Sequence, residues 1–172
     1  MPAKNIILFV ETYYNDLEFW YPKIRLTEAG ASVIVAGPKA GGEYKSKYGM
    51  PAKADIAFAD LDPDTADALV IPGGYAPDMI RRDKDALAFT RAMHEMNKPV
   101  AFICHAGWVP VSAGIVQGRT VTSFFAIKDD LVNAGAEWVD EAVVVDGNLI
   151  TSRTPDDLPA FCRELVKMVG LA

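Results

Sequence analysis

The stretch that decides the fold is VAFICHAG, residues 100–107, where an apolar run leads directly into a cysteine and a histidine. Val100–Ile103 lacks polar alternation, which is typical of a strand covered on both faces in a parallel sheet. The small residues Ala106 and Gly107 then open a helix. A strand that turns sharply into a helix presents one side chain above the sheet, as in a nucleophile elbow. The segment therefore predicts an α/β domain with Cys104 at a strand end.

Similar apolar runs recur along the chain and alternate with segments of helical period. They are Ile6–Val10, Val33–Ala36, Ala68–Ile71 and Val143–Val145. Asp146-Gly147-Asn148 predicts a hairpin turn that leads into a further strand, Leu149–Thr151. This alternation predicts a doubly wound α/β fold, a three-layer sandwich of a mainly parallel sheet with helices on both faces. No linker or repeat divides the chain, so we expect one domain, residues 1–172.

Two of the predicted helices carry clear signals. The first, Asp16–Ala29, has apolar residues at helical spacing: Leu17, Trp20, Tyr21 and Ile24. Pro22 inside it predicts a kink. The last helix is predicted to begin at Thr154 as the N-cap, with Asp157 reaching back as in a capping box. Its expected buried stripe comprises Leu158, Phe161, Cys162, Leu165 and Val169.

Composition excludes several classes of protein. With 17 basic and 23 acidic side chains the net charge is −6, which argues against a general nucleic-acid binder. No apolar run approaches the ~20 residues that a membrane span needs, and Ile6–Val10 is too short for a signal-peptide core. Two cysteines cannot form a disulfide framework and indicate a reducing compartment. We expect a soluble, cytoplasmic domain.

Ligands of open parallel sheets bind beyond the carboxyl ends of the strands, where Cys104 is expected. The following helix start favours a thiolate, so we interpret Cys104 as a reactive thiol rather than a buried structural cysteine. Cys162, in mid-helix, is interpreted as a packed apolar residue. His105 is the only base beside Cys104, unless it is merely a structural histidine at a helix start. His94 falls on another helix and is expected to be solvated.

Four further residues carry open alternatives. The N–H groups of Gly73 and Gly74 can face a developing oxyanion, although Pro-Gly-Gly is also an ordinary turn. Asp78 is either a helix-start carboxylate or a catalytic partner. Glu18, at the start of the first helix, is either a functional acid or a complement to the helix dipole. No dinucleotide fingerprint or metal-ligand spacing is present, so we expect no cofactor and no metal.

Taken together, these motifs resemble the DJ-1/PfpI superfamily, and most closely its PfpI-like branch (peptidase C56-type). The resemblance spans nearly the whole chain. Its landmarks are Asp16-Leu17-Glu18, Ala68–Asp78 (ALVIPGGYAPD), Val100–Trp108 (VAFICHAGW), Ile127–Gly135 (IKDDLVNAG) and Glu137–Asp157. The resemblance implies a flavodoxin-like sandwich that self-associates as dimers or hexamers.

The resemblance also implies roles for individual residues. Cys104 would be the nucleophile or oxidisable thiol, and Glu18 a largely protonated acid that hydrogen-bonds it. Backbone around Gly74 and His105 would form the oxyanion site. Asp78 of a neighbouring subunit would complete a Cys-His-acid triad.

The chain departs from the family pattern near the expected site, which puts peptidase activity in doubt. Ala106 replaces a glycine, Phe102 replaces a small residue and crowds the elbow, and Asp78 replaces a glutamate. Phe124 stands for a tyrosine and Asn15 for an acid. An aromatic-lined pocket is suggested by Trp20, Tyr75, Trp108, Phe124 and Phe125.

The leading hypothesis is a cysteine-dependent enzyme that acts on a small carbonyl compound or its adduct through Cys104 and His105. The reaction would be glyoxalase- or deglycase-like hydration, or C–N hydrolysis, with Gly73, Gly74, Tyr75 and Phe124 around the substrate. The alternative is a redox- or stress-sensing protein whose Cys104 is oxidised without physiological turnover. A third possibility is a binding subunit with a dead site. Expected partners are the carbonyl substrate and further copies of the chain, with no membrane and no specific nucleic acid.

Overall fold

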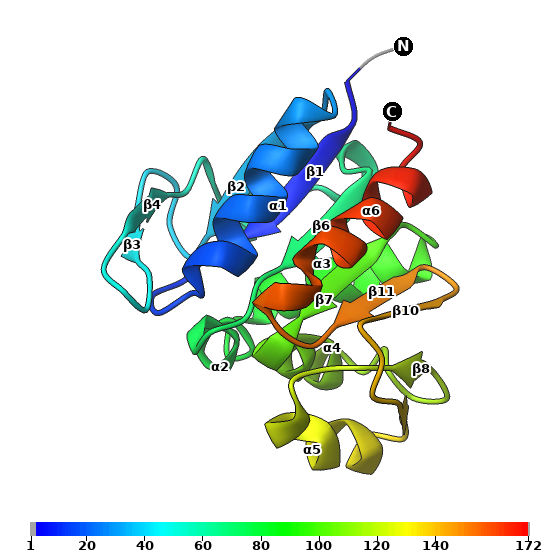
Figure 1. The fold of residues 1–172 in the computed structure, drawn as a ribbon. Coiled ribbons are helices and arrows are strands. Elements are labelled where there is room, and N and C mark those ends of the chain that lie inside the picture. Colours follow the sequence, from blue (N-terminus) through cyan, green and yellow to red (C-terminus); the bar gives the residue numbers. More distant parts are fainter. Residues whose placement is uncertain (1–2, 172) are drawn as a thin grey trace.

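The computed structural model describes residues 3–171, and its centre is a seven-stranded sheet (Figure 1). The strand order is β10-β11-β7-β6-β1-β2-β5. The strands are β1 (Asn5–Phe9), β2 (Ser32–Gly37), β5 (Ile56–Ala57), β6 (Ala68–Ile71), β7 (Val100–Ile103), β10 (Val143–Asp146) and β11 (Leu149–Ser152). Neighbouring strands are parallel except β10 and β11. Two small sheets pair β3 (Glu43–Lys45) with β4 (Pro51–Lys53), and β8 (Thr120–Val121) with β9 (Glu137–Trp138).

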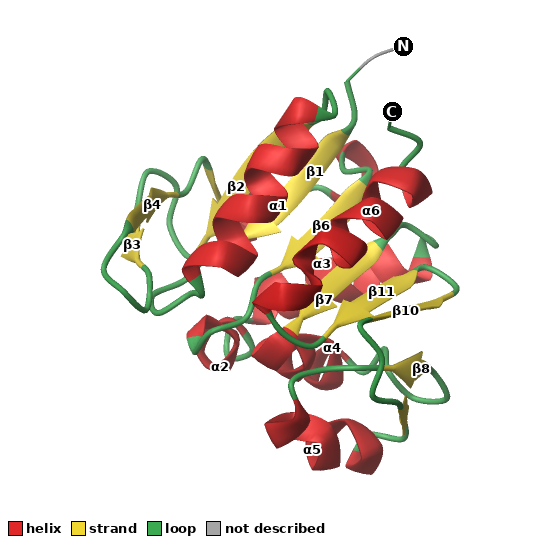
Figure 2. Ribbon diagram, viewed as in Figure 1, coloured by secondary structure: helices red, strands yellow, loops and turns green. Residues whose placement is uncertain are grey.

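Helices cover both faces of the sheet (Figure 2). They are α1 (Asp16–Glu28), α2 (Ala76–Ile80), α3 (Lys84–Glu95), α4 (Trp108–Ala113), α5 (Lys128–Asn133) and α6 (Leu158–Met168). On one face α1 contacts α6, and on the other α3 contacts α4. The predicted three-layer α/β sandwich is therefore confirmed. No helix within residues 3–171 is both long enough and apolar enough to cross a membrane.

The inner strands follow the apolar runs of the sequence. Every residue of β6 and β7 is buried, as expected for strands covered on both faces. Burying each large aliphatic side chain contributes about 1.5–3 kcal/mol, so these runs hold the middle of the sheet. The hairpin is also confirmed, with Gly147 at φ +58° between β10 and β11.

Val143–Val145 does not fit the prediction of a parallel strand covered on both faces. It lies in β10, which pairs antiparallel with β11 at the edge of the sheet and is only partly buried. The parallel neighbour of β7 is instead β11, whose four residues are all buried. A short apolar run cannot distinguish an edge strand from an inner one, because the two differ only in what covers them.

The predicted apolar stripe of the first helix is also wrong. Leu17 and Ile24 are 59% and 64% exposed. The residues of α1 that are buried are Glu18, Phe19, Pro22 and Leu26. Pro22 lies inside this helix, which runs without a break from Asp16 to Glu28. The helix is thus turned so that an acidic side chain, and not Leu17, faces the interior.

The start of the last helix differs from the prediction, whereas its buried face does not. Pro155–Asp157 is a 3-10 turn that precedes α6, and Thr154 makes no side-chain cap hydrogen bond. The carboxylate of Asp157 accepts instead from the backbone N–H and the guanidinium of Arg153. The whole predicted stripe, Cys162 included, is buried.

Candidate active site

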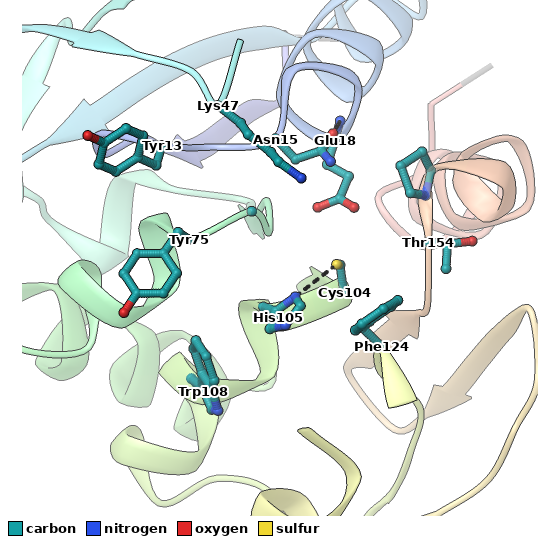
Figure 3. A pocket seen from close by; sticks show the side chains of 12 residues that line it. Tyr13, Asn15, Glu18, Lys47, Tyr75, Cys104, His105, Trp108, Phe124 and Thr154 are labelled. Carbon is teal, nitrogen blue, oxygen red and sulfur yellow. Dashed lines mark hydrogen bonds between the residues drawn. The ribbon is translucent and has the colours of Figure 1, made fainter. Parts of the chain in front are cut away.

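Cys104 occupies the turn that the sequence predicts, between the end of β7 and the 3-10 turn Cys104–Gly107. Its φ is +63°, in the left-handed region that residues with a Cβ rarely adopt. Holding such a residue there costs about 1–3 kcal/mol and is most often seen at functional sites. This backbone turns the sulfur toward the carboxyl edge of the sheet, beside His105 and Glu18 (Figure 3).

The His105 imidazole is directed at the sulfur. Its Nδ1 lies 3.3 Å from the Sγ of Cys104. The ring stacks on Phe124 with centroids 5.0 Å apart, and the edge-on ring of Trp108 lies at 5.3 Å. The Nε1 of Trp108 donates to Asp130 at 2.7 Å, which fixes the indole. We call Phe124 and Trp108 the aromatic clamp, because they restrain the imidazole without any carboxylate.

Glu18 is a fully buried carboxyl at the start of α1. The side chain of Asn15 accepts from the amides of Leu17 and Glu18 and so fixes the first turn of the helix. The Oε2 of Glu18 accepts from the amide of Gly73 at 2.7 Å, and its Oε1 has no hydrogen-bond partner among the described residues. Burial raises the pKa of Glu18 to about 8 and outweighs the Gly73 hydrogen bond. The acid is therefore mostly protonated at neutral pH.

The resting state of Cys104 differs from the predicted thiolate. Cys104 is only 8% exposed, and burial, followed by the neighbouring Glu18, raises the pKa of its thiol. Hydrogen bonds from the backbone of His105 and Gly74 act in the opposite direction but do not compensate. Burial also lowers the pKa of His105, and Lys47 lowers it further. The site therefore holds a thiol beside a neutral imidazole, which can take its proton.

A cavity of about 580 Å³ opens over these groups (Figure 3). Its aromatic walls are Tyr13, Tyr75, Trp108 and Phe124. The segments after β1, β6 and β7 all contribute to it, as expected for the carboxyl edge of a parallel sheet. The predicted site residues that line it together are Cys104, His105, Glu18, Gly74, Tyr75 and Phe124.

Two predicted site residues lie outside the cavity lining. The amide of Gly73 is taken by Glu18, so it is not free for an oxyanion. Asp78 lies on α2 and forms an ion pair with Arg82.

Three other expectations need correction. Neither Trp20 nor Phe125, both expected in an aromatic wall, lines the cavity. His94 is half-buried instead of solvated, and burial lowers its pKa. The expectation for Cys162 is confirmed, since it is 1% exposed within α6.

Two further residues line the cavity although no sequence motif indicated them. Tyr13 follows β1 and has a φ of +64°, a left-handed conformation that the local sequence does not predict. Lys47 comes from the loop between β3 and β4, outside the main sheet. No strand-end rule could have placed Lys47 here, because the hairpin reaches the site only through tertiary contacts.

The chain is similar to known proteins over nearly its whole length. The sequence model described as the DJ-1/PfpI family matches residues 4–168. A deglycase of Thermococcus kodakarensis is 48% identical, and the deglycase PfpI of Pyrococcus furiosus is 44% identical. Each alignment covers 96% of this chain and 99% of the relative.

Solved structures show the same fold. A two-domain protein of Anabaena variabilis with DJ-1/ThiJ/PfpI-like and ferritin-like domains has a TM-score of 0.96 at 39% identity. That match covers 98% of this chain and 48% of the other. Drosophila melanogaster DJ-1beta has a TM-score of 0.91 at 28% identity, covering 98% and 92% of the two chains.

Proposed function

Because the chain belongs to the DJ-1/PfpI family, we propose that it is a cysteine-dependent enzyme acting on a small carbonyl compound or on its adduct with an amine or thiol. Relatives named deglycases support this class of substrate. The observation that carries the proposal is the 3.3 Å approach of His105 Nδ1 to Cys104 Sγ on a left-handed turn that lines the cavity.

In the first step, neutral His105 takes the thiol proton as the sulfur of Cys104 adds to the carbonyl carbon. The carbonyl oxygen becomes negative and accepts hydrogen bonds from the backbone N–H groups of His105 and Gly74, which both point at the sulfur in the resting site. The imidazolium then returns the proton to that oxygen, giving a neutral hemithioacetal. Protonated Glu18 avoids placing a second negative charge beside the thiolate.

For a 2-oxoaldehyde, the reaction then proceeds without an external oxidant. A proton leaves the former aldehyde carbon and another is returned to the neighbouring ketone carbon, so the first carbon is oxidised as the second is reduced. The product is a thioester of a 2-hydroxy acid. Water cleaves the carbon–sulfur bond, which releases the hydroxy acid and restores the thiol. The net change is the addition of one water molecule. With an amine adduct, the sulfur of Cys104 forms a bond to the former aldehyde carbon as the carbon–nitrogen bond breaks. The amine leaves with the thiol proton, which His105 transfers, and the product is the same hemithioacetal.

Asp78 of a neighbouring subunit would be the acid that completes the site beside His105. In the single chain the aromatic clamp already restrains His105, and Asp78 pairs with Arg82 on α2. A carboxylate arriving from another copy would stabilise the imidazolium that forms during attack.

The redox-sensor alternative has weaker physical support. Oxidation requires the thiolate, and sensor cysteines combine a low pKa with exposure. Burial of Cys104 raises its pKa and leaves it 8% exposed, so this thiol suits a base-activated nucleophile better than a sensor.

Replacement of each cysteine tests the proposal. Lactate formation from methylglyoxal is measured for the Cys104→Ala and Cys162→Ala variants. We expect Cys104→Ala to fall to the uncatalysed rate and Cys162→Ala, a matched change in the packed interface of α6, to retain turnover. Undiminished turnover by a folded Cys104→Ala protein would rule the mechanism out.

A further inference from the structure

Lys47 brings a positive charge into the cavity from outside the main sheet. It lies in the loop between β3 and β4 and lines the cavity with Cys104 and His105. Figure 3 shows its side chain extending from the hairpin toward the space over these two residues. Lys47 forms no ion pair with any carboxylate within residues 3–171.

The hairpin that carries Lys47 is held against the segment that carries Glu18. The amide of Lys47 donates to the carbonyl of Tyr14 at 2.9 Å. Ser46 donates its hydroxyl to Asp16 at 2.5 Å, and the Tyr14 hydroxyl donates to the Met50 carbonyl at 2.8 Å. These hydrogen bonds fix the backbone of Lys47 relative to the start of α1.

The cavity carries a net positive charge at neutral pH. Of the described residues that line it, Lys47 and Glu18 are the only lysine, arginine, aspartate or glutamate side chains. Glu18 is mostly protonated at pH 7, because its pKa is about 8. His105 is neutral, since burial and Lys47 both lower its pKa. One unneutralised ammonium remains, in a protein whose net charge is −6.

Asn15 supplies a second donor on the same side of the cavity. Its Oδ1 is occupied by the amides of Leu17 and Glu18, which leaves its NH₂ group as the part free to donate. Asn15 also lines the cavity. One ammonium and one amide NH₂ match the two oxygens of a carboxylate, whereas a phosphate dianion would leave a charge unbalanced.

We infer that Lys47 and Asn15 form a carboxylate subsite, so that the preferred substrates are carbonyl adducts bearing a carboxylate a few bonds from the reacting carbon. This inference rests on the proposed function, because the reacting carbon is the one that Cys104 attacks. The aromatic walls contact the carbon skeleton, and the two donors hold its anionic end. Discrimination against a neutral analogue of the same shape is the expected consequence.

Two substrates that differ by one charge test the inference. They are the methylglyoxal hemithioacetals of N-acetylcysteine and of N-acetylcysteine amide, prepared with excess thiol. For the wild-type protein we expect kcat/KM to favour the carboxylate substrate about three- to tenfold, as for an ion pair at a partly open site. Direct binding of the unreactive N-acetyl-S-methylcysteine and its amide, measured by titration calorimetry, should show the same preference without turnover.

Variants separate the subsite from general surface charge. Lys47→Met should abolish the preference, and Asn15→Asp should abolish it too, since the new carboxylate would pair with Lys47 while still capping α1. Lys45→Met is the matched control: it lies on the same hairpin, is exposed and does not line the cavity, so the preference should persist.

The outcomes distinguish the two proposals. Equal turnover of both substrates by the wild-type protein would overturn the subsite and leave the proposed function standing. No turnover of either substrate would overturn the proposed function instead, and the dissociation constants of the two unreactive ligands would then still decide the subsite. Loss of the preference in Lys45→Met as well as Lys47→Met would assign it to long-range charge and overturn the subsite.

Discussion

Burial sets the protonation of the two acidic groups at the centre of the site. Glu18 and Cys104 lie side by side and are both buried, and burial raises the pKa of each. The pKa of Glu18 is about 8, so this carboxyl is mostly protonated at neutral pH. A buried carboxyl of this kind links stability to pH with a sign opposite to that of a salt-bridged one.

Glu18→Gln tests this linkage. Because the folded pKa of about 8 exceeds the ordinary 4.5, the contribution of Glu18 is fully present below pH 4.5 and is lost as pH rises through 8. The difference of 3.5 pKa units (8 − 4.5) corresponds to about 5 kcal/mol. When urea unfolding is measured from pH 4 to 9, the free energy of unfolding of the variant should rise by about 5 kcal/mol relative to that of the wild-type protein. A difference between the two proteins that does not change with pH would contradict the assignment.

The aromatic clamp makes a separate prediction about His105. Phe124→Leu removes the ring that stacks on the imidazole, so the Nδ1 is no longer held toward the sulfur. We expect kcat to fall about tenfold or more with little change in KM, as when a reacting group is displaced. Steady-state kinetics provides the measurement.

Two variants control for the loss of bulk at the clamp. Phe125→Leu changes a neighbouring ring that is 72% exposed and does not line the cavity, so kcat should be unaffected. Phe124→Tyr keeps the ring and should keep kcat. Equal losses in Phe124→Leu and Phe125→Leu would show that the clamp has no special role.

At the scale of elements, the sequence predicted those features that depend on local composition. The runs Ala68–Ile71 and Val100–Ile103 are apolar at every position and became inner parallel strands. The stripe of α6 was correct because the helical repeat alone decides which residues share a face, wherever the helix begins. The position of Cys104 could be predicted because a residue directly after an inner parallel strand lies at the carboxyl edge of the sheet.

Other elements could not be predicted because their environment is assembled from distant segments. The buried face predicted for α1 was wrong. A proline and an acid lie on the face that is buried, whereas Leu17 and Ile24 are exposed. The protonation of Cys104 depends on how α1, β6 and β7 exclude water together. The position of Lys47 depends on hydrogen bonds that join the β3–β4 hairpin to the start of α1.

At the scale of the whole molecule, the proposed role of Asp78 requires two copies of the chain. Within one chain Asp78 lies on α2, paired with Arg82, and is absent from the described lining of the cavity. An acid contributed by a neighbour would make each site a composite of two subunits. Such composite sites can be restored by mixing two different defective variants.

Mixing Cys104→Ala with Asp78→Asn tests this arrangement. Each variant alone should have lost most of its turnover. After subunit exchange, the mixed oligomers contain sites with an intact Cys104 from one copy and an intact Asp78 from the other, so turnover should reappear. Sedimentation of the same samples gives the size of the oligomer. If the mixture shows only the summed activity of the separate variants although subunits have exchanged, Asp78 does not act across an interface.

A covalent bond to one sulfur atom is the central claim, and peptide mass mapping after a rapid acid quench during methylglyoxal turnover tests it most directly. The account predicts that the peptide containing Cys104 gains the mass of one substrate molecule early in turnover and returns to its original mass when substrate is exhausted. The peptide containing Cys162 should stay unmodified throughout. Steady consumption of substrate with an unmodified Cys104 peptide at every quench time would contradict the account.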